Sequence, residues 1–112
     1  MESQSVSIQI YETEDGKQPF SHWFHRLKDQ KAQFIIAQRI ERIRLGNYGD
    51  CKSVGDQVFE LRMDYGPGYR LYFAKEGKTL VLLLCGGDKS SQVKDIKQAQ
   101  AYLIDYRRQA DA

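Results

Sequence analysis

The sequence is poor in cysteine and proline, and it has no long apolar run. Cys51 and Cys85 stand far apart, without a CxxC partner or a cluster of histidines, so we expect no metal site, no redox pair and no cofactor. Two prolines in 112 residues are too few for a linker-like or disordered chain. The longest apolar run, Leu80 to Cys85, is far shorter than the ~20 residues that span a bilayer. The start, Met1 to Gln4, has neither the basic nor the apolar part of a signal peptide, which predicts a cytoplasmic protein without a membrane partner.

Charge of one sign is also scarce. Seventeen lysines and arginines stand against 15 aspartates and glutamates, which gives a formal net charge of +2. Bulk charge therefore does not indicate a nucleic-acid-binding protein, and only the placement of the basic residues can do so. A length of 112 residues suits one hydrophobic core, so we predict that residues 1–112 form a single domain that folds on its own.

The first half of the chain predicts one strand and two helices. Apolar side chains alternate with polar ones at positions 6, 8 and 10, which is the period of a half-buried strand. Pro19 suits the first turn of a helix whose apolar face recurs at positions 20, 23, 24 and 27. Asp29 is the expected N-cap of a second helix that ends before Gly46. The outer face of this helix is either a solvated surface or a contact with a partner or RNA, and it carries Gln33, Arg39, Arg42 and Arg44.

The second half predicts three strands and a helix. Residues 58–63 and 69–75 read as a hairpin joined by the turn-forming segment 64–68, and residues 79–85 read as a strand buried on both faces. A last helix follows, with an inward stripe formed by Val93, Ile96, Ala99, Leu103 and Tyr106. The predicted order of elements is therefore β-α-α-β-β-β-α.

Pleating places four polar side chains on one face of the predicted hairpin. Side chains along a strand point alternately to opposite faces, so Glu60 and Arg62 lie opposite the apolar residues of their strand. In a regular hairpin Arg70 and Tyr72 share that face. Planar, permanently charged arginines suit phosphate oxygens, so the set is typical of a phosphodiester site. The alternative is that the carboxylate and the arginines form cross-strand ion pairs on a solvated face.

Two glycines follow the last predicted strand and bring Asp88 and Lys89 within reach of the same face. Gly86-Gly87 either lets a ligand approach free backbone N–H groups or simply makes a sharp connection to the helix. The two histidines belong to the first predicted helix, away from this face, so we expect surface or core residues there.

Three runs of the sequence carry a resemblance to a known family: FELR at 59–62, GPGYRLYF at 66–73 and LLCGGDKSSQ at 83–92. Together they resemble the HigB-like addiction module killer proteins of the RelE/ParE toxin superfamily, over nearly the whole chain. The resemblance implies an α+β, RelE/ParE-like fold with a mainly antiparallel four-stranded sheet. It also implies that the helices pack on one face of this sheet and that an open concave face meets RNA.

The resemblance further implies an activity. RelE-like toxins cleave messenger RNA, usually on the ribosome, by making a 2′-hydroxyl attack its own adjacent phosphate without a metal ion. This implies an mRNA interferase that inhibits translation, in which Arg70 stabilises the transition state and Arg62 and Lys89 supply further positive charge. Glu60 is the candidate general base. The catalytic histidine or C-terminal tyrosine of many relatives has no counterpart here, so either Lys89 or Asp88 donates the proton, or catalysis depends on electrostatics and on the geometry of the ribosome. The residues expected to bind RNA are Tyr72, Asp88 and Lys52.

Two other functions stay open at this point. One is a ParE-like gyrase inhibitor, although ParE-type toxins tend to lack the aligned basic residues of this chain. The other is a non-catalytic module that acts by binding an antitoxin. The resemblance implies a cognate HigA-like antitoxin with a helix-turn-helix, and contact with DNA only through that complex. This partner would cover the basic face, or dock elsewhere, at Tyr48, Tyr65 or the last helix.

Overall fold

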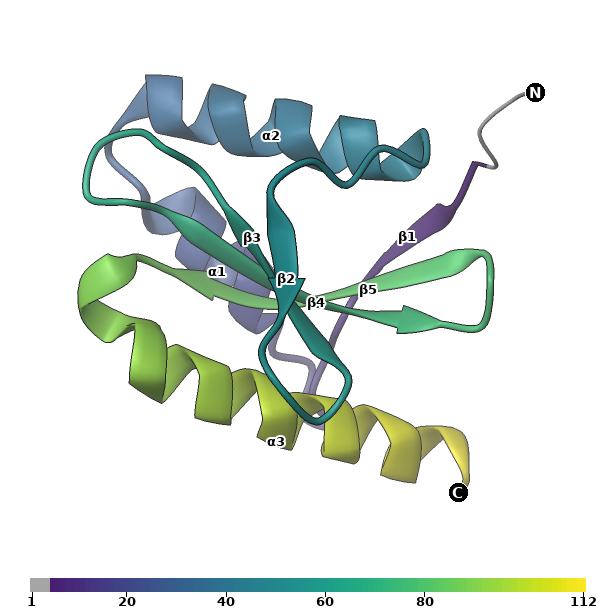
Figure 1. Ribbon diagram of the computed structural model, residues 1–112. Helices are drawn as coiled ribbons and strands as arrows, with labels where there is room; N and C mark the ends of the chain where they lie inside the picture. The colour runs from purple at the N-terminus through teal and green to yellow at the C-terminus, as the bar shows by residue number, and fades with distance from the viewer. Residues whose placement is uncertain (1–4) are drawn as a thin grey trace.

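The computed structural model describes residues 5–112, and Figure 1 shows how its elements are arranged. In chain order they are β1 (Ser7–Ile10), α1 (Pro19–Arg26), α2 (Gln30–Arg44), β2 (Cys51–Ser53), β3 (Val58–Arg62), β4 (Arg70–Glu76), β5 (Leu80–Gly87), the 3₁₀-helix η1 (Lys89–Ser91) and α3 (Gln92–Ala110). Met1 to Gln4, on which the expectation about a signal peptide rests, lie outside the described residues. Within residues 5–112, no helix has both the length and the apolar character needed to cross a membrane.

The α+β class and the predicted order of elements are confirmed, with one strand more than predicted. The sheet is five-stranded and mixed, in the order β1-β5-β4-β3-β2, so the prediction of four strands is wrong. β1 runs parallel to β5, and the other neighbouring strands are antiparallel. Patterning missed β2 because it is a three-residue edge strand with partly or fully exposed side chains, which show no apolar alternation.

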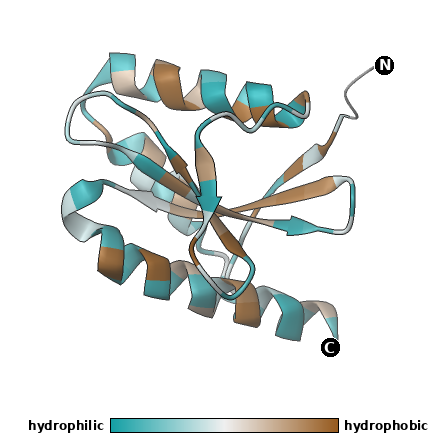
Figure 2. Ribbon diagram, in the orientation of Figure 1, coloured by the Kyte–Doolittle hydropathy of each residue, from teal (hydrophilic) through white to brown (hydrophobic). Residues whose placement is uncertain are grey.

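Helices cover both faces of the sheet, so the prediction that they pack on one face is also wrong. α1 and α2 contribute to the core on one face, and α3 to the core on the other, with α2 at the top and α3 at the bottom of Figure 1. The physical reason lies in β4, whose residues 71–74 are buried one after another. Consecutive burial requires an apolar layer on each face, and Figure 2 shows the hydrophobic colouring of the central strands.

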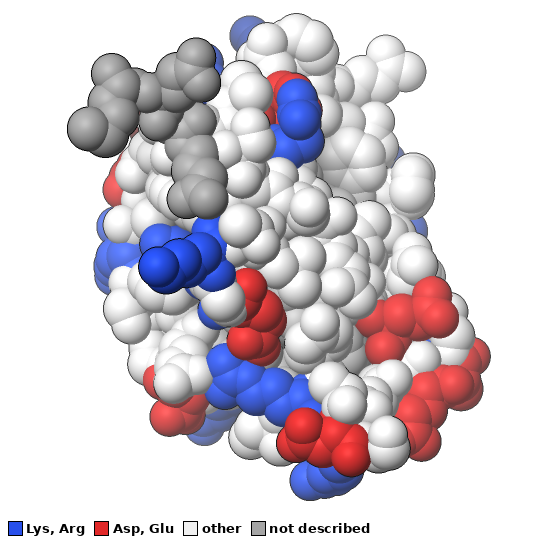
Figure 3. Space-filling view, turned by 90° about the vertical axis from the view of Figure 1, so that its right-hand side faces the viewer, with Lys and Arg blue, Asp and Glu red and all other residues white. Residues whose placement is uncertain are grey.

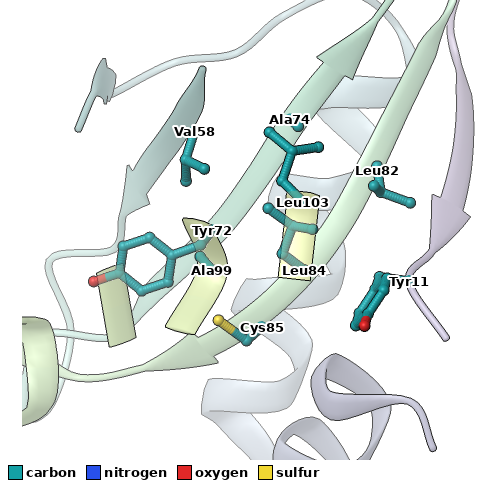
Figure 4. Packing of buried hydrophobic residues seen from close by; sticks show 9 residues of the cluster. All are labelled: Tyr11, Val58, Tyr72, Ala74, Leu82, Leu84, Cys85, Ala99 and Leu103. Carbon is teal, nitrogen blue, oxygen red and sulfur yellow. The ribbon is translucent and has the colours of Figure 1, made fainter. Parts of the chain in front are cut away.

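The predicted inward stripe of α3 is confirmed at Ala99 and Leu103, which pack against the sheet (Figure 4). Ile96 and Tyr106 pack at the margin of the same cluster. Val93 was predicted to point inward, but 71% of it is exposed. At 3.6 residues per turn, Val93 points about 100° away from the middle of the stripe, which places it on the side of the helix.

Both predicted helix starts are confirmed. Pro19 opens α1, and the Asp29 carboxylate accepts hydrogen bonds from the backbone N–H groups of Lys31 (2.9 Å) and Ala32 (3.1 Å). These bonds satisfy two of the N–H groups that the start of a helix leaves unpaired. The same carboxylate accepts a hydrogen bond from the Tyr65 hydroxyl at 2.8 Å, which ties α2 to the loop between β3 and β4.

Candidate active site

The two strands that carry the predicted site pair in the expected register. Glu60 of β3 lies opposite Tyr72 of β4, and Arg62 lies opposite Arg70. All four side chains therefore belong to the α3 side of the sheet. An ion pair does form, between Arg62 Nε and Glu60 Oε1 at 3.0 Å, but it lies along one strand. Across the hairpin two arginines face each other, and like charges directly opposite destabilise a hairpin. Glu60 offsets part of this repulsion, because it pairs with Arg62 and interacts electrostatically with Arg70.

A cleft of about 480 Å³ lies at the end of this hairpin. Its lining consists of Asp50, Arg62, Met63, Asp64, Gly66, Pro67, Gly68, Arg70 and Lys89. Three of the four residues predicted to be catalytic, Arg62, Arg70 and Lys89, thus surround one hollow. They come from β3, β4 and η1, which meet at the left of Figure 1.

The wall of the cleft formed by the β3–β4 loop is held in place from two sides. The backbone N–H of Lys89 donates to the carbonyl oxygen of Pro67 at 3.4 Å, which links the loop to η1. On the other side, Tyr65 and Tyr69 stack with ring centroids 6.4 Å apart, and Tyr69 meets the edge of Trp23 in α1. With the Tyr65–Asp29 bond, these contacts fix the loop that shapes the cleft.

Glu60 is fully buried and bound to the cleft residue Arg62, and protein donors occupy its oxygens. It accepts hydrogen bonds from Arg62 Nε (3.0 Å), the Tyr72 hydroxyl (3.0 Å) and Gln92 Nε2 (2.8 Å). Burial alone would raise the pKa of this carboxyl, but the three hydrogen bonds and the charge of Arg70 outweigh it and lower the pKa below its ordinary value. A buried carboxylate of lowered pKa is a poor general base, so its placement favours a positioning role over the predicted base.

The two arginines of the cleft differ in their protein contacts. Arg62 uses Nε to hold Glu60, which leaves its terminal nitrogens for a ligand, and about a third (36%) of its side chain is exposed. Arg70 Nε is buried, and among residues 5–112 it has no hydrogen-bond acceptor. Nη2 of Arg39 is likewise buried without an acceptor among these residues, so the unpaired Nε of Arg70 does not by itself indicate a ligand, and it is the position of Arg70 in the lining of the cleft that makes its guanidinium available to one.

The three residues predicted to bind RNA, Tyr72, Asp88 and Lys52, do not line the cleft. Tyr72 is fully buried, so a direct contact with RNA does not fit its position, and burial together with Glu60 raises its pKa. Asp88 caps η1 and accepts hydrogen bonds from the backbone N–H of Ser90 (2.8 Å) and from its hydroxyl. Lys52 is exposed on the edge strand β2 opposite Glu60 and does not line the cleft.

Sequence reasoning missed three residues of this region. Asp50 and Asp64 are exposed and line the cleft; the place of Asp64 in the predicted turn hinted at this, whereas Asp50 gave no signal because β2 beside it was not predicted. Arg39 was assigned to the outer face of α2, yet it is half-buried and its Nη1 donates to the carbonyl oxygen of Arg62 at 2.9 Å. Arg39 therefore helps to fix the backbone that carries Arg62. The histidines lie on α1 and outside the cleft, as predicted.

The two glycines at the end of β5 serve helix packing. A Cβ atom on Gly86 would lie 2.3 Å from the ring of Trp23 in α1, and one on Gly87 would lie 1.8 Å from Oδ2 of Asp95 in α3. Helices thus approach the strand from opposite faces at successive residues. The sequence offered two interpretations of Gly86-Gly87, a site where a ligand approaches the backbone and a sharp connection to the helix. The structure instead places both glycines in β5, where they make room for the side chains of two helices.

We expect Gly86→Ala to destabilise the protein by about 2–3 kcal/mol, because the added methyl group has no space beside Trp23. Chemical denaturation of the wild type and the variant measures this difference. In the double variant Gly86→Ala/Trp23→Ala, the cost should be smaller than the sum of the two single substitutions, since removing the indole opens the space. Wild-type stability of Gly86→Ala would contradict the packing role.

On the side of the molecule away from the cleft, basic and acidic side chains are mixed. Figure 3 shows the side at the right of Figure 1, where basic and acidic side chains adjoin each other. Ion pairs elsewhere in the fold include Arg107 with Glu76 (3.0 Å) and Arg44 with Glu41. The cleft is distinguished by two arginines that face each other rather than by the net charge of the protein.

No protein-family model matches the chain. An uncharacterized protein of Haemophilus influenzae is 54% identical to it over 81 residues. The match covers 72% of this chain and 82% of the Haemophilus protein. Identity at this level over most of both sequences indicates common descent, and the chain therefore belongs to the same protein family as this Haemophilus protein.

Proposed function

We propose that this protein is a RelE-like, HigB-like toxin of a toxin–antitoxin system and that it cleaves messenger RNA without a metal ion. The observation that carries the proposal is the cleft in which Arg62, Arg70 and Lys89 converge. Permanently charged, planar guanidinium groups suit the oxygens of a phosphodiester, especially as negative charge grows on them during reaction.

The reaction is an internal transfer of the phosphoryl group. A base removes the proton of a 2′-hydroxyl, and the 2′-oxygen attacks the adjacent phosphorus to form a pentavalent phosphorane. The bond from phosphorus to the 5′-oxygen then breaks as an acid supplies a proton to that oxygen. The products are a 2′,3′-cyclic phosphate and a 5′-hydroxyl end, so no water or cofactor is consumed.

The residues of the cleft take distinct parts in this scheme. Arg70 and Arg62 stabilise the charge on the phosphorane, and Glu60 orients Arg62 from below. The exposed carboxylates of Asp50 and Asp64 are the groups in the cleft that can accept the 2′ proton. Lys89 is the proposed acid, because the oxygens of Asp88 are engaged with Ser90.

The same proposal includes the partners of such a toxin. Messenger RNA bound to the ribosome in the cytoplasm is the substrate, and a helix-turn-helix antitoxin neutralises the toxin and connects it to DNA. Two arginines facing each other at the cleft favour a phosphodiester substrate over a purely protein target, and this argues against the gyrase inhibitor and the non-catalytic module.

Induced expression in bacterial cells tests the proposal. We expect growth arrest together with new messenger RNA ends that carry a 5′-hydroxyl group, in frame with codons if cleavage takes place on the ribosome. Mapping of 5′ ends and a gyrase supercoiling assay are run on the same cultures. Arrest without new ends but with loss of supercoiling would favour the gyrase inhibitor, and arrest with neither change would favour a non-catalytic module.

A further inference from the structure

A second hollow, of about 820 Å³, adjoins the cleft along the first turns of α3. Lys89 lines both hollows. The remaining lining comes from η1 and from α3 residues three and four apart, including Val93, Lys94, Lys97 and Ala101. Residues at this spacing share one helix face, so the hollow, here termed the α3 hollow, continues from the cleft along the outside of α3.

The α3 hollow is basic. Lys89, Lys94 and Lys97 are exposed, and no acidic residue lines it. The ion pairs formed within residues 5–112 include none of these lysines. Of the neighbouring carboxylates, Asp88 caps η1 and Asp95 accepts a hydrogen bond from Ser91, and Asp95 also feels the charge of Lys94, but neither lines the hollow. Three lysines and no carboxylate in the lining therefore give the α3 hollow a positive surface.

We infer that single-stranded RNA leaves the cleft along the α3 hollow, with its phosphates beside Lys89, Lys94 and Lys97. This inference rests on the proposed function and adds the path of the RNA. Residues three apart on a helix have Cβ atoms about 5–6 Å apart, which suits successive phosphates of an extended strand. The exposed Val93 side chain also lines the hollow, where it can make apolar contact with a ribose or base.

Binding of RNA oligonucleotides of two lengths tests the path. The probes are 2′-O-methyl RNAs of about 4 and about 12 nucleotides, which lack the attacking hydroxyl and are not cleaved. We expect Lys94→Gln/Lys97→Gln to bind the longer RNA roughly tenfold more weakly than the wild type, and the shorter RNA equally well. The slope of log affinity against log salt concentration should fall by about 1.4 for the longer RNA.

The matched control is Lys78→Gln/Arg108→Gln, which removes two exposed cations from the β4–β5 turn and the far end of α3. This variant should bind both RNAs like the wild type. The path would be overturned if Lys94→Gln/Lys97→Gln bound the longer RNA as tightly as the wild type does. It would also be overturned if the wild type bound neither RNA. Binding of a poly-glutamate peptide in place of RNA would assign the α3 hollow to an acidic protein. If cells still acquire 5′-hydroxyl messenger RNA ends in these cases, the proposed function stands and only the path falls.

Discussion

Replacement of Arg70 by alanine should lower the rate of messenger RNA cleavage by about 10²–10³-fold, the usual cost of losing one transition-state donor. Arg70 lines the cleft beside Arg62 and Lys89, so its removal deprives the phosphorane of one of the three cations proposed to surround it. Growth arrest should disappear with the new 5′-hydroxyl ends. The measurement is mapping of 5′ ends in cells that express the wild type or Arg70→Ala to equal levels.

The stability of Arg70→Ala provides the control. Removal of Arg70 relieves repulsion with Arg62 across the hairpin but also removes a charge that favours the ionised form of Glu60, so we expect the free energy of unfolding to stay within about 1 kcal/mol of the wild-type value. Arg70→Lys keeps the charge but not the planar pair of donors, so it should retain only part of the activity. Undiminished cleavage by a folded Arg70→Ala would remove the central residue of the proposal.

Glu60→Ala is expected to have the largest effect on folding. The substitution leaves Arg62, Tyr72 and Gln92 without their common acceptor in a buried position. Breaking a buried charged network from one side costs about 3–5 kcal/mol. Denaturation by urea measures the loss, and Glu60→Gln, which keeps the shape and two acceptor sites, should lose less.

The pH dependence of stability provides an independent test of Glu60. Its pKa is lowered in the folded state, so its contribution is fully present above its ordinary value of 4.5 and is lost as the pH falls through the folded pKa. The pKa values of Asp29 and Asp105 are also lowered, while burial raises that of Asp95, which acts in the opposite direction. The comparison is therefore between wild type and Glu60→Gln, measured from pH 7 to about pH 3. The wild type should lose more stability, and equal losses would contradict the network.

The kinetics of Glu60→Gln separate a positioning role from a basic one. If Glu60 orients Arg62, the substitution should lower kcat and leave the shape of the pH profile of cleavage unchanged. Loss of the general base would remove the limb of the profile that reports its ionisation. A changed limb would restore Glu60 as the base and displace Asp50 and Asp64.

Local patterns predicted much of this protein. The alternation of β1, the start of α1 at Pro19 and the cap of α2 at Asp29 depend on neighbours within a few residues, and the structure confirms them. The shared face of Arg62 and Arg70 was predictable for the same reason, because pleating and a regular hairpin fix it.

Tertiary structure decided the rest. The burial of Glu60 depends on Gln92, 32 residues away, and on the docking of α3 over a sheet face that the sequence alone left open. The strand β2, the carboxylates of Asp50 and Asp64 and the inward turn of Arg39 likewise depend on where distant segments meet. Periodicity determines which way a side chain points from its own strand or helix, whereas burial, and hence pKa and chemical role, is set by what packs against it.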